Sequence, residues 1–394
     1  MNLTGPAVGD SVGLRSRVVR WREDAHALFH ADWLLVGIVF AISGLGLATI
    51  FSSTNALTQV SGLPRGHYVT RQAIALGLGL LALGATASFD YRRWKELWPL
   101  LYGATVPLLV LVRYLGGGRG GTTAWFDLGP LQFQPSEVAK LVIVIAVASY
   151  CHAHRGELDA WRLAVAVAIA GFAMALTMLQ NDLGTTLVMG ACALGVLFVS
   201  GLRMVHTFAL IGLAISCLVG LLVSDSFNEY RIERLTGFMN QQNVEDARDA
   251  SATEYTLQLS KDAIANGGIW GQGYGAGQLT QNGYVPEQHT DFIFTAISEE
   301  FGFVGAGALI GVYALLCWRI WRAAMLAHDF QGTLLCMGVL AIFVFQIFEN
   351  IGMTMGIMPI TGIPLPFMSY GGSAMIAYFA AIGIVVNVHM RRFS

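Results

Sequence analysis

The fold is decided by residues 286–314, PEQHTDFIFTAISEEFGFVGAGALIGVYA, where a polar segment runs directly into an apolar one. The apolar part is close to the roughly 20 residues that a helix needs to cross a bilayer. Its start holds four ionisable residues, namely His289, Asp291, Glu299 and Glu300. Ionisable groups at a membrane helix are costly, so they usually face a cavity, a partner or a substrate. Asp291 is therefore the first candidate for chemistry.

The rest of the sequence has the composition of a membrane protein. Hydrophobic residues make up 55% of the 394 residues and charged residues 12%, whereas an average soluble domain has roughly 25% charged residues. The formal net charge of −2 argues against nucleic acid as a partner. The five cysteines have neither zinc nor disulfide spacing, and we expect them to be small core residues. We expect an all-α polytopic protein of the plasma (inner) membrane, in contact with membrane lipids.

Hydropathy predicts about ten transmembrane helices. They lie near 33–53, 72–89, 98–115, 136–152, 163–180, 184–200, 205–224, 291–318, 332–352 and 370–389. An even number of spans places both termini on one side, and most Arg and Lys residues then lie in short segments on that side, as the positive-inside rule requires. We therefore expect cytoplasmic termini, with an N-terminal tail at 1–31 and a membrane domain at 32–394.

One predicted extracytoplasmic loop, 225–290, is far longer than the other connections. Loops beyond about 15 residues without secondary structure are usually functional or disordered. Its middle, QQNVEDARDASATEY at 241–255, is polar, which predicts a mobile segment. Its end, GGIWGQGYGAGQLTQNGYVPEQH at 267–289, is rich in glycine and aromatic residues, and we expect the glycines to shape the loop. The loop ends just before Asp291, which places that carboxylate at the outer surface.

Asp291 has two readings from the residues alone. If Thr290 caps the next helix, Asp291 lies in its first turn, where the helix dipole favours an anion. A carboxylate there can accept a proton from a hydroxyl nucleophile, or it can simply start the helix. Two turns deeper, Glu299 and Glu300 either extend a polar stripe from Asp291 or pair with neighbouring helices.

A second cluster is FQPSEVAKL at 133–141, also at an outer helix end. Pro135 in the first turn marks a helix start. Glu137 and Lys140 are i,i+3 neighbours with the acid first, the order that favours an ion pair. A structural ion pair is one interpretation, and a cation that meets an anionic head group is the other.

Two more clusters belong to the same side of the membrane. NDLGTTLV at 181–188 places Asp182 at a helix start, and Gly184 suggests close packing or a turn. The region 350–373, NIGMTMGIMPITGIPLPFMSYGGS, contains Ser369 and three prolines that forbid a continuous helix. Irregular backbone at membrane depth must be buried in protein or line a watery cavity. Four features therefore converge on the outer side, which favours a site there.

These motifs, in this order, resemble those of the SEDS family (shape, elongation, division and sporulation), which includes RodA-type and FtsW-type proteins. The resemblance covers residues 32–392, and the end VNVHMRRF is slightly closer to the RodA type. It implies a peptidoglycan glycosyltransferase that polymerises lipid II at the outer face during elongation or division. It also implies a class B penicillin-binding protein as the crosslinking partner.

The resemblance also implies roles for individual residues. The family's essential aspartate falls on Asp291, which would take the proton from the 4-hydroxyl of the acceptor sugar as that oxygen attacks the donor's anomeric carbon with inversion. The family's Glu and Lys after its QPS element fall on Glu137 and Lys140. A divalent cation, Mg²⁺ or Mn²⁺, is an option for offsetting the leaving pyrophosphate, although no dedicated metal-ligand spacing is visible.

The sequence departs from the family pattern at three positions. Ala124 replaces a common arginine, Asn181 a common proline and Gln288 another common arginine. Because two basic groups are missing, other cations are needed to hold the pyrophosphate. Four basic residues are candidates, namely Arg119, Lys140, Arg231 and Arg234.

Two other functions stay open at this point. In a flippase for a lipid-linked cell-wall precursor, the intramembrane Glu and Lys residues would line a translocation path. A scaffold without activity is suggested only by the departures from the family pattern. The long outer loop that ends in an acid favours chemistry at the outer face.

Overall fold

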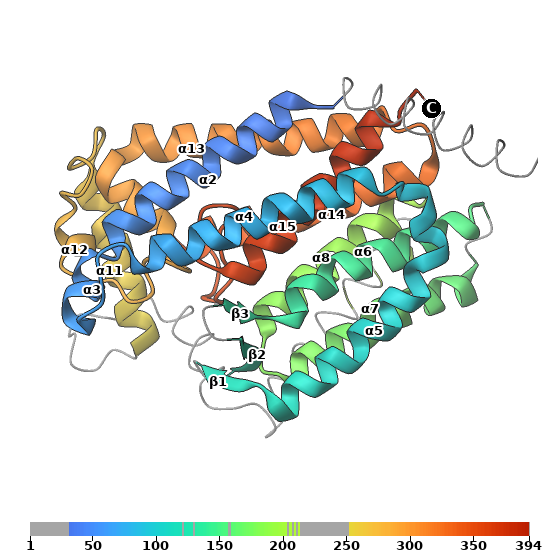
Figure 1. Cartoon of the computed structure of the whole chain (residues 1–394), viewed down its shortest axis with the longest axis horizontal. Coiled ribbons are helices and arrows are strands. Elements are labelled where there is room, and N and C mark those ends of the chain that lie inside the picture. The colour runs from blue at the N-terminus through green and yellow to red at the C-terminus, as the bar shows by residue number, and fades with distance from the viewer. Residues whose placement is uncertain are drawn as a thin grey trace, which may run out of the picture.

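The computed structural model describes residues 31–119, 122–128, 131–156, 159–202 and 252–393, with a few single positions between 205 and 212. Figure 1 shows an elongated helical bundle. One end of the bundle carries α3 (Asn55–Ser61), α11 (Ala252–Gly267) and α12 (Gln278–Gln281), and we call it the loop end. The C-terminus lies at the opposite end.

The long helices coincide with the predicted spans wherever the chain is described. They are α2 Trp33–Ser53, α4 His67–Ser88, α5 Trp94–Leu115, α6 Pro135–Ala153, α7 Ala160–Leu179, α8 Leu183–Val199, α13 Ile293–Met325, α14 Phe330–Thr354 and α15 Gly372–Met390. Within the described ranges, 8 helical segments are long and apolar enough to cross a membrane, and α8 is a shorter apolar helix. The predicted span 205–224 lies outside the described residues apart from single positions, so the total of ten stays a prediction.

Aspartate side chains fix the starts of four of these helices. Asp32, Asp159, Asp182 and Asp329 are the N-cap residues of α2, α7, α8 and α14, and each accepts a hydrogen bond from a backbone N–H of the first turn. The first N–H groups of a helix lack partners within the helix, so these caps satisfy donors that would otherwise be unpaired in an apolar setting. The helix ends are thus encoded locally.

The centre of the bundle is formed by α6 and α15, whose residues are nearly all buried. α15 packs along α4, while α6 packs against α5, α8 and α14. Small residues allow close contact: a Cβ atom at Gly338 of α14 would lie 2.5 Å from Val144 Cγ1 of α6. Close helix approach through small residues is the usual way in which membrane helices gain packing contacts.

Between α5 and α6 the chain forms a small antiparallel sheet that the all-α expectation did not include. Its strands are β1 (Gly117–Arg119), β2 (Thr122–Leu128) and β3 (Leu131–Phe133), in the order β1-β2-β3. The sheet lies where α5 ends and α6 begins, at the lower ends of these helices in Figure 1. The sequence TTAWFDL of β2 is rich in β-branched and aromatic residues, which favour strands.

The long loop contains a helix where a mobile segment was predicted. Residues 252–255 of the predicted mobile stretch begin α11, so that prediction is wrong there, whereas 241–251 lie outside the described residues. Leu257, Ser260 and Ala263 recur every three residues along α11 and are buried, and α11 packs against α13. This helical spacing, and the burial that it permits, stabilises α11 despite its polar start.

Helix α13 is broken at Gly302, where φ is 66° and ψ is −165°. The backbone groups that lose their helical partners at this break form hydrogen bonds with the glycine-rich loop. Phe303 N–H donates to the Gly268 carbonyl (2.8 Å), and Gly273 N–H donates to the Glu300 carbonyl (3.0 Å). Buried backbone groups need such partners, so the loop and the break form one unit. The predicted shaping role of the loop glycines is therefore confirmed at Gly271, where a Cβ would lie 2.2 Å from the Glu300 carbonyl oxygen.

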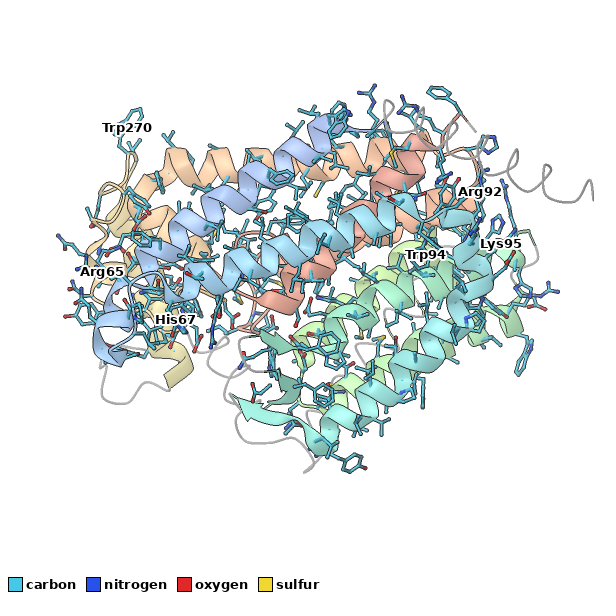
Figure 2. The ribbon with its side chains drawn as sticks, viewed as in Figure 1. Arg65, His67, Arg92, Trp94, Lys95 and Trp270 are labelled. Carbon is cyan, nitrogen blue, oxygen red and sulfur yellow. The ribbon has the colours of Figure 1, made fainter. Side chains whose placement is uncertain are left out.

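Polar and aromatic side chains gather at both ends of the bundle. Figure 2 shows Arg65, His67 and Trp270 at the loop end, and Arg92, Trp94 and Lys95 toward the opposite end. Polar and aromatic side chains are common at the two membrane–water interfaces. Their positions therefore agree with helices that run from one end of the bundle to the other across a bilayer.

Candidate functional site

Asp291 lies at the loop end, in the turn that joins α12 to α13, and its side chain is partly exposed. Because α13 begins at Ile293 with Phe292 as its N-cap, the prediction that Thr290 caps this helix with Asp291 in the first turn is wrong. The Thr290 hydroxyl instead donates to the Glu287 carbonyl at 3.1 Å. Asp291 thus sits two residues before the helix.

The turn around Asp291 is fixed by its backbone. The Glu287 carbonyl accepts the N–H groups of Thr290 (3.1 Å) and Phe292 (3.2 Å), one on each side of Asp291. The carbonyl of Asp291 accepts a hydrogen bond of 2.8 Å from the side chain of Asn350 at the C-terminal end of α14. These contacts hold the main chain, so the carboxylate is presented from a rigid turn at the partly exposed surface.

Glu349 is a second acid at this place, and the sequence analysis missed it. It is buried on α14 and accepts a hydrogen bond of 2.5 Å from Thr361 Oγ1, and the residue after it, Asn350, binds the Asp291 carbonyl. The available signal was the one used for Glu299, an acid inside an apolar span. The fourth motif, at 350–373, begins one residue after Glu349 and therefore does not include it.

Glu137 and Lys140 form the ion pair that their spacing indicated. Lys140 Nζ lies 2.7 Å from Glu137 Oε2, and both side chains are 2% exposed. The ammonium group also lies 5.6 Å from the ring centre of Tyr378 on α15. Because Lys140 is enclosed by these partners, the arrangement favours the structural interpretation over contact with a head group in this conformation.

Asp182 joins three elements near the same end. It caps α8 by accepting from Thr185 N–H (2.9 Å), and its other oxygen accepts from the Gln134 side chain (2.9 Å) at the start of α6. The N–H of Gln134 donates to the hydroxyl of Ser373, in the first turn of α15, at 2.9 Å. Gly184 permits the close packing expected of it, since a Cβ there would lie 2.8 Å from the Thr361 carbonyl oxygen.

Glu299 and Glu300 bind neighbouring elements rather than extending a stripe from Asp291. Glu299 accepts three hydrogen bonds from α12: Leu279 N–H at 2.8 Å, Thr280 N–H at 2.9 Å and the Thr280 hydroxyl at 2.6 Å. Glu300 accepts from the Ser52 hydroxyl of α2 and from the Gln281 side chain at 3.2 Å. These contacts favour the alternative in which both acids pair with neighbouring parts of the chain.

His289 and Ser369 lie at the border of the site. The His289 carbonyl accepts the Tyr370 N–H at 2.9 Å, and its ring packs against the rings of Tyr68 (5.1 Å) and Tyr370 (5.6 Å). Burial lowers the pKa of His289 from its ordinary value of 6.5, an effect that the charge of Glu287 opposes. The Ser369 carbonyl accepts a hydrogen bond of 3.0 Å from the Gln72 side chain of α4.

The departures from the family pattern have local structural explanations. The Gln288 amide is buried and donates to the carbonyls of Ser53 (2.6 Å) and Thr280 (2.8 Å). Asn181 has φ of 65°, which proline cannot adopt, so the turn before α8 needs a residue such as asparagine. Ala124 is buried in β2. Each substitution therefore fits its surroundings in this chain.

The four basic residues predicted to hold a pyrophosphate differ in what the structure describes of them. Lys140 is buried in its ion pair. Arg119 is the last residue of β1, and Arg231 and Arg234 lie outside the described residues. The prediction for these three arginines therefore stays a prediction.

A comparison with protein-family models shows one match over almost the whole chain. The family model FtsW/RodA/SpoVE, described as "Cell cycle protein", matches residues 32–393. This match identifies the family of the chain, and it spans nearly all of the membrane domain predicted at 32–394.

Individual relatives and structures agree with this match. Stage V sporulation protein E of Bacillus subtilis (strain 168) is 33% identical over 91% of this chain and 96% of its own length. Peptidoglycan glycosyltransferase MrdB of Escherichia coli (strain K12) is 33% identical over 88% of this chain and 92% of its own length. A solved structure described as "Structural coordination of polymerization and crosslinking by a peptidoglycan synthase complex" superposes with a TM-score of 0.76 at 34% identity, covering 92% of this chain and 99% of that one. The chain therefore belongs to the FtsW/RodA/SpoVE (SEDS) family.

Proposed function

We propose that this chain is an inverting peptidoglycan glycosyltransferase that polymerises lipid II, with Asp291 as the general base. Relatives of similar length carry the name peptidoglycan glycosyltransferase, which supports the activity. The observation that carries the assignment of the base is the placement of Asp291. It is a partly exposed carboxylate on a fixed turn, at an end of the bundle where broken and irregular segments meet.

The proposed reaction balances as a single displacement. The 4-hydroxyl oxygen of the acceptor sugar forms a bond to the anomeric carbon of the donor, and the bond from that carbon to the pyrophosphate oxygen breaks. The pyrophosphate leaves with the electron pair on its lipid carrier, and the hydroxyl proton passes to Asp291. A fixed carboxylate suits this step because general-base catalysis depends on placing the acceptor oxygen within hydrogen-bond reach of the proton.

The leaving pyrophosphate requires positive charge nearby. With Lys140 enclosed by Glu137 and Tyr378, we assign this role to Arg119, Arg231 and Arg234. Within the described ranges, no group of three or more His, Cys, Asp or Glu side chains is arranged to hold a metal ion. A divalent cation, Mg²⁺ or Mn²⁺, would therefore be carried mainly by the phosphate oxygens of the substrate and would offset their charge.

The proposed function also implies a membrane location, an orientation and a partner for this chain. The apolar helices and the family make this a multi-pass membrane protein. We propose that the termini are cytoplasmic, so that the loop end and Asp291 face outward, where lipid II is polymerised. We further propose a class B penicillin-binding protein as partner. The similar structure of a peptidoglycan synthase complex, whose description names both polymerisation and crosslinking, supports this choice.

The test is polymerisation of lipid II by the purified protein in detergent, followed by sizing of the glycan chains. We expect the wild type to make glycan and Asp291→Asn to lose at least about 100-fold in rate, because the amide cannot take up the proton. Asp262→Asn is the matched control, since Asp262 is an exposed aspartate on α11 at the same end. A flippase would leave lipid II monomeric in this assay, because flipping moves the lipid across a membrane and forms no glycosidic bond.

A further inference from the structure

Three aromatic rings meet close to the turn of Asp291, and the reaction described above does not use them. Tyr68 comes from the first turn of α4, His289 from the turn before α13, and Tyr370 from the segment before α15. The ring centres lie 5.1 Å apart for Tyr68 and His289, 5.4 Å for Tyr68 and Tyr370, and 5.6 Å for His289 and Tyr370. We call these three side chains the ring cluster.

Hydrogen bonds between the three segments hold the ring cluster in place. The N–H of Tyr370 donates to the His289 carbonyl at 2.9 Å. The Gln72 side chain of α4 donates to the Ser369 carbonyl (3.0 Å) and accepts from the Gly371 N–H (3.1 Å). Gln72 is 1% exposed, so one buried amide group binds the backbone on both sides of Tyr370. The backbone that carries these rings is therefore fixed without any ligand, which lowers the cost of binding one.

The ring cluster is fixed in position but still open to the surface. Its three side chains are partly exposed, and so is Asp291. One residue separates His289 from Asp291 in the chain, so their Cα atoms lie at most about 7 Å apart. His67, whose ring centre lies 5.5 Å from that of Tyr68, marks this part of the loop end in Figure 2. A substrate that reaches Asp291 can therefore touch these rings as well.

Tyrosine and histidine rings match the chemistry of a sugar. One face of a pyranose ring is formed by C–H groups, whereas its rim carries hydroxyl and amide groups. The aromatic rings offer a flat apolar face and a polar edge, so they can cover the C–H face and form hydrogen bonds with the rim. Ligand sites commonly combine aromatic walls with a few placed polar groups. A tyrosine that only anchors the protein at the bilayer surface needs no buried amide to fix its backbone.

We propose that the ring cluster is the platform on which a sugar ring of lipid II stacks beside Asp291. This inference rests on the proposed function, and it names the part of the substrate that this surface holds. The pyrophosphate and the lipid carrier are bound by other residues. Loss of a ring face should therefore weaken the binding of the substrate that bears sugars, whereas the carrier alone should bind as before.

The experiment measures the Kd of two ligands for the purified protein in detergent, namely lipid II and undecaprenyl pyrophosphate, the carrier without sugars. An Asp291→Asn background prevents turnover during the measurement. We expect Tyr370→Leu in that background to raise the Kd for lipid II by about five- to tenfold, the effect of losing one aromatic contact. The Kd for undecaprenyl pyrophosphate should not change. Tyr370→Phe keeps the ring face and should leave both values unchanged.

Two further variants complete the experiment. Tyr284→Leu is the matched control, since Tyr284 is an exposed tyrosine of the loop before α13 and lies outside the ring cluster. Tyr68→Leu removes a second ring from a different helix and should also weaken the binding of lipid II alone. It decides the matter if the melting temperature shows that Tyr370→Leu does not fold. With Asp291 intact, both cluster variants should raise the KM for lipid II and leave kcat near the wild-type value.

Three results would overturn the inference. One is an unchanged Kd for lipid II in a folded Tyr370→Leu or Tyr68→Leu protein. Another is an equal rise in Kd for both ligands, which would show that the rings hold the carrier or support the fold. The third is the same rise for Tyr370→Phe or for Tyr284→Leu. Failure of the proposed function looks different, because the wild type would then make no glycan, while the Kd values could still be measured.

Discussion

Two acids at the loop end, Glu299 and Asp291, lie in opposite surroundings. Glu299 accepts three hydrogen bonds from α12 and is fully buried. Asp291 is partly exposed on a turn before α13. Both have the same sequence signature, an acid at or inside an apolar segment.

The difference teaches that the surroundings of an acid, and not its sequence signature, separate the two roles. A buried carboxylate whose oxygens are filled by backbone and hydroxyl donors holds parts of the chain together and has little capacity left for a substrate. A partly exposed carboxylate on a fixed turn can be reached by a substrate. We therefore expect substitution of Glu299 to lower the free energy of unfolding, and substitution of Asp291 to lower the rate of lipid II polymerisation.

The largest effect is expected at Gly302, the break that brings Glu299 and Glu300 against the loop. A Cβ there would lie 2.3 Å from the backbone nitrogen of Gly271, at a φ of 66°. Gly302→Ala should lower the free energy of unfolding by about 3 kcal/mol or more, because a clash with backbone adds to a strained conformation. Thermal unfolding in detergent measures this loss.

Gly307→Ala is the matched control for that prediction. Gly307 lies on the same helix, and a Cβ there has no atom within 4 Å. We expect its melting temperature to stay near that of the wild type. Equal melting temperatures for both variants would show that the break in α13 does not depend on Gly302.

A smaller loss of stability is expected for Glu299→Gln. The amide nitrogen of glutamine would face a backbone donor of Leu279 or Thr280, where a carboxylate oxygen now accepts. Loss of a charged acceptor with buried donors left unpaired costs about 2–3 kcal/mol. The melting temperature should fall accordingly, whereas Glu96→Gln at an exposed position should change little. An unchanged melting temperature for Glu299→Gln would remove the contrast with Asp291.

Features encoded by local spacing could be predicted from the sequence. The long helices of the described bundle lie where hydropathy places them, the ion pair of Glu137 with Lys140 follows from its i,i+3 spacing, and Asp182 caps its helix as its position indicated. These features need only neighbouring residues of one helix. Local arguments therefore sufficed for them.

Features that depend on distant partners could not be predicted. The break at Gly302 requires the loop at Gly268 to take up its backbone groups, and glycine inside an apolar helix otherwise indicates packing. Helix α11 is stabilised by burial of Leu257, Ser260 and Ala263 where it packs against α13, a contact that the polar stretch at its start does not reveal. Glu349 becomes noticeable only once the fold brings the end of α14 to the turn of Asp291, through the hydrogen bond from Asn350.

The smallest effect is expected from pH, through His289 at the border of the site. Burial lowers its pKa in the folded protein below the ordinary value of 6.5, so the unfolded chain binds more protons below that pH. Its contribution to stability is therefore complete above pH 6.5 and declines as the pH falls through that value. We expect the melting temperature of the wild type to fall more steeply below pH 6.5 than that of His289→Phe, which keeps a ring against Tyr68 and Tyr370. If the melting temperatures of the wild type and of His289→Phe changed with pH in parallel, the folded protein would not disfavour the protonated form of His289.

The most direct test of the central claim measures both properties of Asp291→Asn in one preparation, namely the rate of lipid II polymerisation and the melting temperature. We predict a rate at least about 100-fold below that of the wild type, with a melting temperature close to the wild-type value. Wild-type turnover by this variant would contradict the assignment of Asp291 as the base. A melting temperature that falls as far as that of Glu299→Gln would contradict the contrast between Asp291 and Glu299.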